Sequence, residues 1–254
     1  MKYILIFFAA FLAACTNSPK DSTQVPTTEP MDEATEIVTA AIEQSGGDKY
    51  ENMKLAFDFR DRTYEGYHND GLFEYVRVTP DSLGEIRDVL NNEGYYRTIN
   101  GDRVELIDSM AGKYQRSVNS VFYFALLPDG LMDPAVRREH MGMKEINGKN
   151  YHKIRVTFGE EGGGDDFQDV FIYWFEEQSL SMDYMAYLYF TDGGGMRFRE
   201  AINPRRVNGV LFQDYYNFKP SEEMPLDSID DVYMAGELEL LSEILMENIQ
   251  VTPI

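Results

Sequence analysis

Alternation of apolar and polar positions begins near residue 53 and dominates the rest of the chain. Leu55, Phe57 and Phe59 alternate with polar or small residues, which is the two-residue period of a half-buried strand. Similar runs follow at residues 71–79, 84–90, 94–100, 103–108, 143–146, 149–158, 167–175, 181–190, 196–203 and 210–218. Turn pairs such as Asn147-Gly148 separate them and are typical of hairpins. The pattern predicts about ten antiparallel strands joined by short turns.

Two stretches have helical periodicity instead. Residues 32–44 carry apolar side chains on one face, behind acidic residues that favour a helix N-terminus. Residues 114–127 place an apolar stripe centred on Phe122 before Pro128, and we expect this helix to cover the sheet. Residues 226–254 fit a helix or a strand equally well. We therefore predict one mostly β (α+β) domain over residues 32–254.

The N-terminus has the pattern of a secretory signal. Lys2 precedes an apolar run over residues 4–12, which is too short to cross a bilayer because nine helical residues rise only about 14 Å. Leu12-Ala13-Ala14-Cys15 resembles the bacterial lipobox, which implies that residues 1–14 are removed and that Cys15 is lipidated. The alternative is an ordinary secretory signal with Cys15 as a spare thiol.

The residues that follow Cys15 predict where the domain is held. Residues 15–31 are polar and rich in proline, so we expect a disordered tether between the lipid and the domain. Thr16 directly after the cysteine resembles the pattern sent to the outer membrane of Gram-negative bacteria. The expected location is therefore the cell envelope, as an outer-membrane lipoprotein.

Composition excludes several classes of function. The chain has 23 Lys and Arg against 44 Asp and Glu, a net charge of -21, which argues against nucleic-acid binding. Its single cysteine permits no internal disulfide. His68, His140 and His152 show no metal-ligand spacing, so we predict no metal site and no cofactor.

The apolar strand faces are the first candidate for binding. They offer a pocket for a flexible apolar chain, although the same side chains would also make a packed core. The candidate ligand-binding residues are Phe57, Phe59, Phe122, Met182, Tyr184, Leu188, Phe198, Phe212 and Tyr216.

Two arginines are candidates for binding an anion. Arg197 and Arg199 alternate with apolar neighbours and so face away from the apolar set. They either seat a carboxylate or phosphate headgroup at the pocket rim or pair across strands with Asp183, Asp214 or other acids. The acidic, glycine-rich residues 160–166 lack the spacing of a calcium loop and favour a solvated hairpin tip.

The order of several motifs resembles LolA/LolB-like periplasmic lipoproteins, and more narrowly an uncharacterised lipoprotein family of Bacteroidota. The segments that carry the resemblance are residues 34–59, 146–156, 171–190 and 206–212, with residues 198–205 and 214–215 for the narrower family. One departure is Gln213, where the former family usually has proline.

This resemblance implies an open antiparallel β half-barrel whose helices cover an apolar cavity for acyl chains. The expected function is a lipid-anchored, non-catalytic envelope protein that binds a hydrophobic or amphiphilic ligand, such as a lipid or acyl chain. The alternatives are a protein-interaction module with a filled core and a hydrolase that uses a pair of carboxylates.

Overall fold

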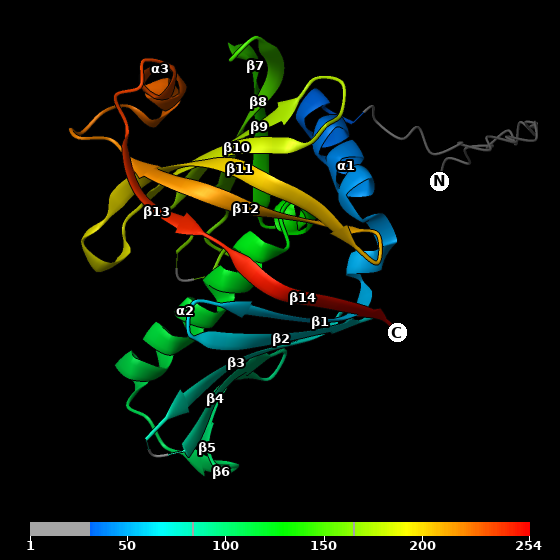
Figure 1. Ribbon diagram of the computed structural model, residues 1–254, viewed down its shortest axis with the longest axis vertical. Coiled ribbons are helices and arrows are strands. Elements are labelled where there is room, and N and C mark those ends of the chain that lie inside the picture. Colours follow the sequence, from blue (N-terminus) through cyan, green and yellow to red (C-terminus); the bar gives the residue numbers. More distant parts are fainter. Residues whose placement is uncertain (1–30, 83, 165) are drawn as a thin grey trace, which may run out of the picture. The chain divides into compact units, whose positions relative to one another are not determined.

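Two antiparallel seven-stranded sheets form the framework of the computed structural model, which describes residues 31–82, 84–164 and 166–254 (Figure 1). The first sheet, in the order β14-β1-β2-β3-β4-β5-β6, contains β1 (Asn52–Phe59), β2 (Arg62–Asn69), β3 (Leu72–Asp81), β4 (Gly84–Asn91), β5 (Gly94–Ile99), β6 (Asp102–Val104) and β14 (Met246–Pro253). The second, in the order β13-β12-β11-β10-β9-β8-β7, contains β7 (Val136–Ile146), β8 (Lys149–Phe158), β9 (Val170–Glu176), β10 (Met182–Tyr189), β11 (Gly195–Val207), β12 (Val210–Lys219) and β13 (Glu239–Ile244).

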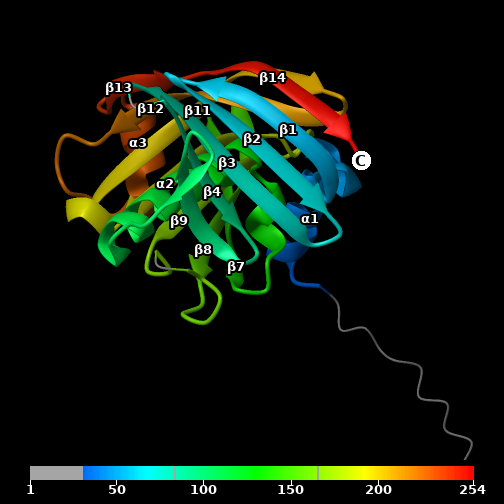
Figure 2. The ribbon, with the colours of Figure 1, turned by 90° about the horizontal axis from the view of Figure 1, so that it is seen from below.

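The β13–β14 segment contributes a strand to each sheet. β13 pairs with β12 in the second sheet, and after Leu245 the chain continues as β14, which pairs with β1 in the first. The buried Asp214 fixes this crossover, because one of its carboxylate oxygens accepts hydrogen bonds from the Met246 amide and from Arg205, both at 2.9 Å. Figure 2 shows β14, β1, β2 and β3 running side by side. The described strands thus make an open half-barrel, and the predicted fold class is confirmed.

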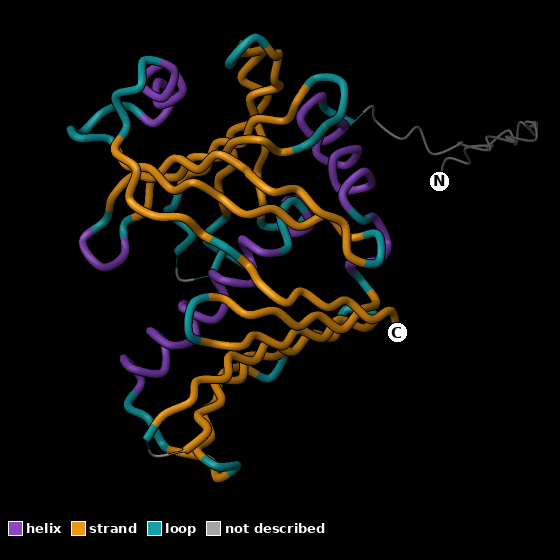
Figure 3. Tube along the Cα trace, viewed as in Figure 1, coloured by secondary structure: helices purple, strands orange, loops and turns teal. Residues whose placement is uncertain are grey.

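Helix α2 (Asp108–Ala125) lies between the two sheets (Figure 3). Its fully buried Phe122 packs on the rings of Tyr75, Phe57 and Tyr64 in the first sheet. The next residue, Tyr123, contacts Phe171 of the second sheet. The internal helix therefore covers the concave face, as its apolar stripe predicted.

The second sheet is covered on both faces. On the concave side, α1 (Glu33–Ser45) buries Ile37 and Val38 against β7, β8 and β9. On the convex side, the 3-10 turn η4 (Leu226–Ser228) and helix α3 (Ile229–Met234) pack Leu226 and Ile229 over Trp174 and its neighbours.

The remaining 3-10 turns are η1 (Gly47–Tyr50), η2 (Asp129–Met132) and η3 (Thr191–Gly193). No helix in the described part of the chain is apolar and long enough to cross a bilayer.

The structure differs from the sequence prediction mainly at β2, β6, β7, α2 and the tail. β6 ends at Val104 instead of residue 108, and β7 begins at Val136 instead of residue 143, because its first half is mostly charged. β2 was not predicted, because one of its inward positions is Gly66, which breaks the apolar alternation and where a side chain would meet the Phe122 ring at 3.0 Å. α2 begins at residue 108 instead of 114, since its first turns are polar. The ambiguous tail becomes α3, β13 and β14. The predicted signal peptide, Cys15 and residues 16–30 of the tether lie outside the described residues.

Candidate functional site

A cavity of about 640 Å³ lies between α2 and the two sheets. Its wall comes from the end of β1, from one side of α2 and from β8 to β12, so residues far apart in the sequence meet there. The aromatic part of the wall is Phe57, Phe59, Tyr64, Tyr123, Phe124, Phe158, Phe171, Tyr187, Tyr189 and Tyr215. A volume of several hundred Å³ whose wall includes ten aromatic side chains is typical of a small-molecule site.

The charge of the cavity wall is opposite to that of the chain. The whole sequence has 44 acidic residues against 23 Lys and Arg, whereas the described residues of the wall include more basic than acidic side chains. The basic ones are Arg60, Arg62, Lys113, Arg116, Arg197 and Arg199, and the acidic ones are Asp166 and Asp169. The cavity therefore favours an anionic ligand in an otherwise strongly acidic protein.

Arg199 is the most buried of these cations, with 7% of its surface exposed. Its guanidinium carbon lies 3.9 Å from the ring centre of Phe124, and Nη2 donates a 2.9 Å hydrogen bond to the Tyr187 hydroxyl. Its Nε is buried without a hydrogen-bond partner, and none of the described carboxylates lies within 4 Å of the guanidinium. A buried charge without a counter-ion is costly, so this site favours binding of an anion.

Arg197 lies two residues away on the same face of β11. Its Nη2 donates to the Tyr189 hydroxyl at 2.9 Å, and its Nη1 donates to the Met196 carbonyl at 2.7 Å. Within the described part of the chain, no acid forms the alternative ion pair with Arg197 or Arg199. Asp214 is paired with Arg205 instead, and Asp183 accepts from Tyr151 and lies near Lys149.

Asp169 adds a titratable group to the cavity wall. Burial raises the pKa of this carboxyl to about 6, although a hydrogen bond from the Phe190 backbone amide opposes the rise. Near neutral pH the wall thus contains one carboxyl group that gains a proton on mild acidification.

The model of a family of unknown function, DUF6503, matches residues 47–248, which is most of the chain. The chain belongs to DUF6503. No curated protein matches this sequence.

Three solved structures are similar to this DUF6503 chain at low identity. A DUF1329 family protein from Desulfovibrio piger is 7% identical, with 87% of this chain and 93% of that chain covered and a TM-score of 0.47. A LolA superfamily protein from Nitrosomonas europaea is 8% identical, with coverages of 86% and 91% and a TM-score of 0.44. A putative outer membrane lipoprotein-sorting protein domain from Vibrio parahaemolyticus is 6% identical, with coverages of 72% and 85% and a TM-score of 0.42.

The predicted site residues of the DUF6503 chain separate into two groups. Phe57, Phe59, Arg197 and Arg199 line the cavity together. The others lie elsewhere. Phe122 and Phe212 are in the core cluster that α2 and the first sheet form with the start of β12, and Met182 is in the core with α1. Tyr184, Leu188 and Phe198 are on the convex face under α3, and Tyr216 is half-buried on β12 outside the cavity wall.

The reason lies in which strand face the cavity uses. The side chains of β10, β11 and β12 that line the cavity include Tyr187, Arg199 and Tyr215. The more uniformly apolar positions of these strands, such as Phe198, face the convex side. On the convex side the C-terminal segment covers these apolar positions. The sequence pattern of residues 226–254 fits a helix or a strand equally well, so it does not predict this cover. The cavity face is the one with tyrosines and arginines, which are polar groups of the kind that line ligand pockets.

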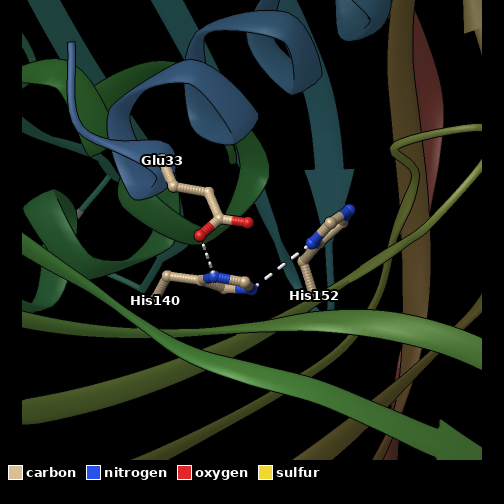
Figure 4. Close-up of side chains that lie close together, drawn as sticks. All are labelled: Glu33, His140 and His152. Atoms are coloured by element: carbon tan, nitrogen blue, oxygen red, sulfur yellow. Dashed lines mark hydrogen bonds and ion pairs between the residues drawn. The ribbon is translucent and has the colours of Figure 1, made fainter. Parts of the chain in front are cut away.

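The structure also brings together two histidines that the sequence spacing separates (Figure 4). His140 Nε2 lies 3.3 Å from His152 Nδ1, and Glu33 approaches His140 Nδ1 at 2.9 Å. The signal in the sequence is the Asn147-Gly148 turn, which folds β7 back along β8. Linear spacing could not show that these side chains meet.

Proposed function

We propose that the protein is a lipid-anchored envelope protein that binds an amphiphile with an anionic headgroup and catalyses no reaction on it. The observation that carries this proposal is Arg199, a buried cation without a described acidic partner in the wall of an aromatic cavity. A ligand with a carboxylate or phosphate supplies the missing counter-ion, and its apolar chain fills the rest of the cavity.

The two parts of the ligand have different partners. The chain packs between Phe57 and Phe59 on one side and Phe171 on the other, which removes apolar surface from water. The headgroup lies at Arg197 and Arg199, whose guanidinium groups bind carboxylate and phosphate in a planar, bidentate manner. Arginine keeps its proton at physiological pH, so these groups bind an anion and do not transfer protons.

The N-terminal sequence supports the location. The apolar run before Leu12-Ala13-Ala14-Cys15 is typical of a lipoprotein signal, and lipidation at Cys15 would hold the domain at a membrane surface. Thr16 favours the outer membrane.

Native mass spectrometry of the chain from Thr16 onward tests the occupant directly. We expect co-purified anionic lipid or fatty acid, and we expect a fluorescent fatty acid to bind once that lipid is removed. A folded chain that carries no lipid and binds no acyl probe would contradict the proposal and favour the alternative of a protein-interaction module.

Arg199→Gln tests the headgroup site. The change should weaken binding of the fatty acid by roughly tenfold or more, because a charge-assisted hydrogen bond is lost. Binding of the matching uncharged fatty alcohol should change little. Arg155→Gln is the control, since Arg155 pairs with Asp227 on the surface, away from the cavity. Equal losses for acid and alcohol would show that Arg199 only shapes the cavity.

A further inference from the structure

We propose that Glu33, His140 and His152 bind a divalent transition-metal ion of the zinc class, which fastens α1 to the β7–β8 hairpin. These side chains come from three elements, and one donor atom from each lies within 4.8 Å of the others. Figure 4 shows the Glu33 carboxylate above the His140 ring, with His152 turned toward the same ring.

A bulge in β7 places His140 in this cluster. Close to the turn, Met143 pairs with His152, but beyond an irregularity in the ladder His140 pairs with Ile154. In an uninterrupted ladder His140 would pair with the next residue along β8, and its side chain would point to the opposite face of the sheet. Gly142, at φ 97°, permits the bulge. Bulges frequently serve to redirect a side chain at a functional site.

The distance between the two imidazoles suits a shared ion. Zinc binds imidazole nitrogen at about 2.0–2.1 Å, so two nitrogens of a tetrahedral site lie about 3.3–3.4 Å apart. His140 Nε2 and His152 Nδ1 are separated by 3.3 Å. The pair therefore already has the spacing of two ligands of one metal ion.

The third histidine in the chain shows a different arrangement. His68 has protein partners at both ring nitrogens, with Nδ1 at 2.7 Å from the Tyr50 carbonyl oxygen and Nε2 at 2.8 Å from the Tyr75 hydroxyl. It is held as a structural residue. His140 also has a neighbour at each ring nitrogen, but those neighbours are Glu33 at Nδ1 and His152 at Nε2, both of which are possible metal ligands. Two of the three histidines in 254 residues thus meet at one place.

The ligand set selects the class of ion and leaves the site accessible. Two imidazoles and one carboxylate suit zinc, cobalt, nickel or copper better than calcium or magnesium, which prefer oxygen ligands. Glu33 lies at His140 Nδ1, and its side chain is 67% exposed, so the carboxylate can turn toward an ion held at Nε2. Solvent can supply a fourth ligand. Because Glu33 is the first residue of α1, the ion would hold the start of that helix against the sheet.

Cobalt and zinc titrations of the full chain, purified in a non-ionic detergent, test the site. We expect cobalt to give the visible absorption of a tetrahedral complex and zinc to abolish it. Zinc at a hundredfold excess over its Kd should raise Tm by roughly 5–10 °C. His152→Gln should remove both responses, and Glu33→Gln should weaken zinc binding by roughly tenfold or more.

Glu36→Gln is the matched control, because Glu36 lies in the same first turn of α1 but outside the cluster. It should bind zinc like the unmodified protein. Equal Tm values for all variants in EDTA would show that folding is intact. Zinc binding no tighter than millimolar, or unchanged binding by His152→Gln, would overturn the proposal. Because the readout is metal binding alone, its failure is distinguishable from failure of lipid binding.

Discussion

Asp129, at the start of η2, is a carboxyl group in an environment that disfavours its charge. Burial, together with the nearby Asp133 and Glu51, raises the pKa of this group to about 7. Its ordinary value is 3.8, so folding favours the protonated form. The resulting contribution to stability is present at acidic pH and is lost as the pH rises through about 7.

Asp129→Asn should therefore stabilise the protein at pH 8 by about 1–3 kcal/mol and flatten the fall in stability between pH 4 and pH 8. Urea denaturation at several pH values measures both effects. Asp61→Asn is the control, because Asp61 is exposed on a turn and should leave the profile unchanged. A loss of stability at pH 8 in Asp129→Asn would show that the charged form makes a favourable contact.

At the scale of single elements, α2 holds the two halves of the half-barrel together through adjacent residues. Phe122 stacks on Tyr75 with ring centres 4.0 Å apart, while Tyr123 shares a 2.6 Å hydrogen bond between hydroxyls with Tyr173 of the second sheet. The helix therefore contributes to the core and, on another side, to the cavity wall.

Phe122→Ala should lower the free energy of unfolding by about 3–5 kcal/mol, because the ring is fully buried and its neighbours are held by the first sheet. Phe57 touches Phe122 and also lines the cavity, so uptake of the fatty-acid probe should change as well. Thermal and urea denaturation and probe titration measure the two effects. Gln115→Ala, at an exposed position of α2, is the control. A variant as stable as the parent would contradict the packing described.

The elements that sequence reasoning predicted best are those with a strict period and clear turns. β8 was predicted at Lys149–Phe158 and α1 within one residue at each end, because turns or glycines mark their limits. The cavity wall was predicted only at Phe57, Phe59, Arg197 and Arg199. Which face of a doubly covered sheet meets a ligand depends on where the tail packs, and the position of a bulge depends on one glycine. Neither is contained in local periodicity.

At the scale of the whole molecule, charge and anchoring act together. A net charge of -21 opposes adsorption to anionic lipid, so the proposed anchor at Cys15 has to supply membrane attachment.

Cys15→Ser should abolish labelling of the protein by radioactive palmitate and remove it from the membrane fraction. Asn17→Ala should be labelled like the parent. Equal labelling of Cys15→Ser and parent would contradict lipidation at this residue.

The crossover from β13 to β14 also has a consequence for the order of folding. Met53 of β1 pairs with Pro253 of β14, so one edge of the first sheet is completed only when two distant parts of the sequence meet. Such long-range pairing forms slowly, since a large loop must close before the contacts stabilise it. Until then β1 presents unpaired backbone groups at an edge, which is where partly folded chains associate with one another. The segment that unites the two sheets therefore also sets the period during which the newly made chain is most prone to aggregation.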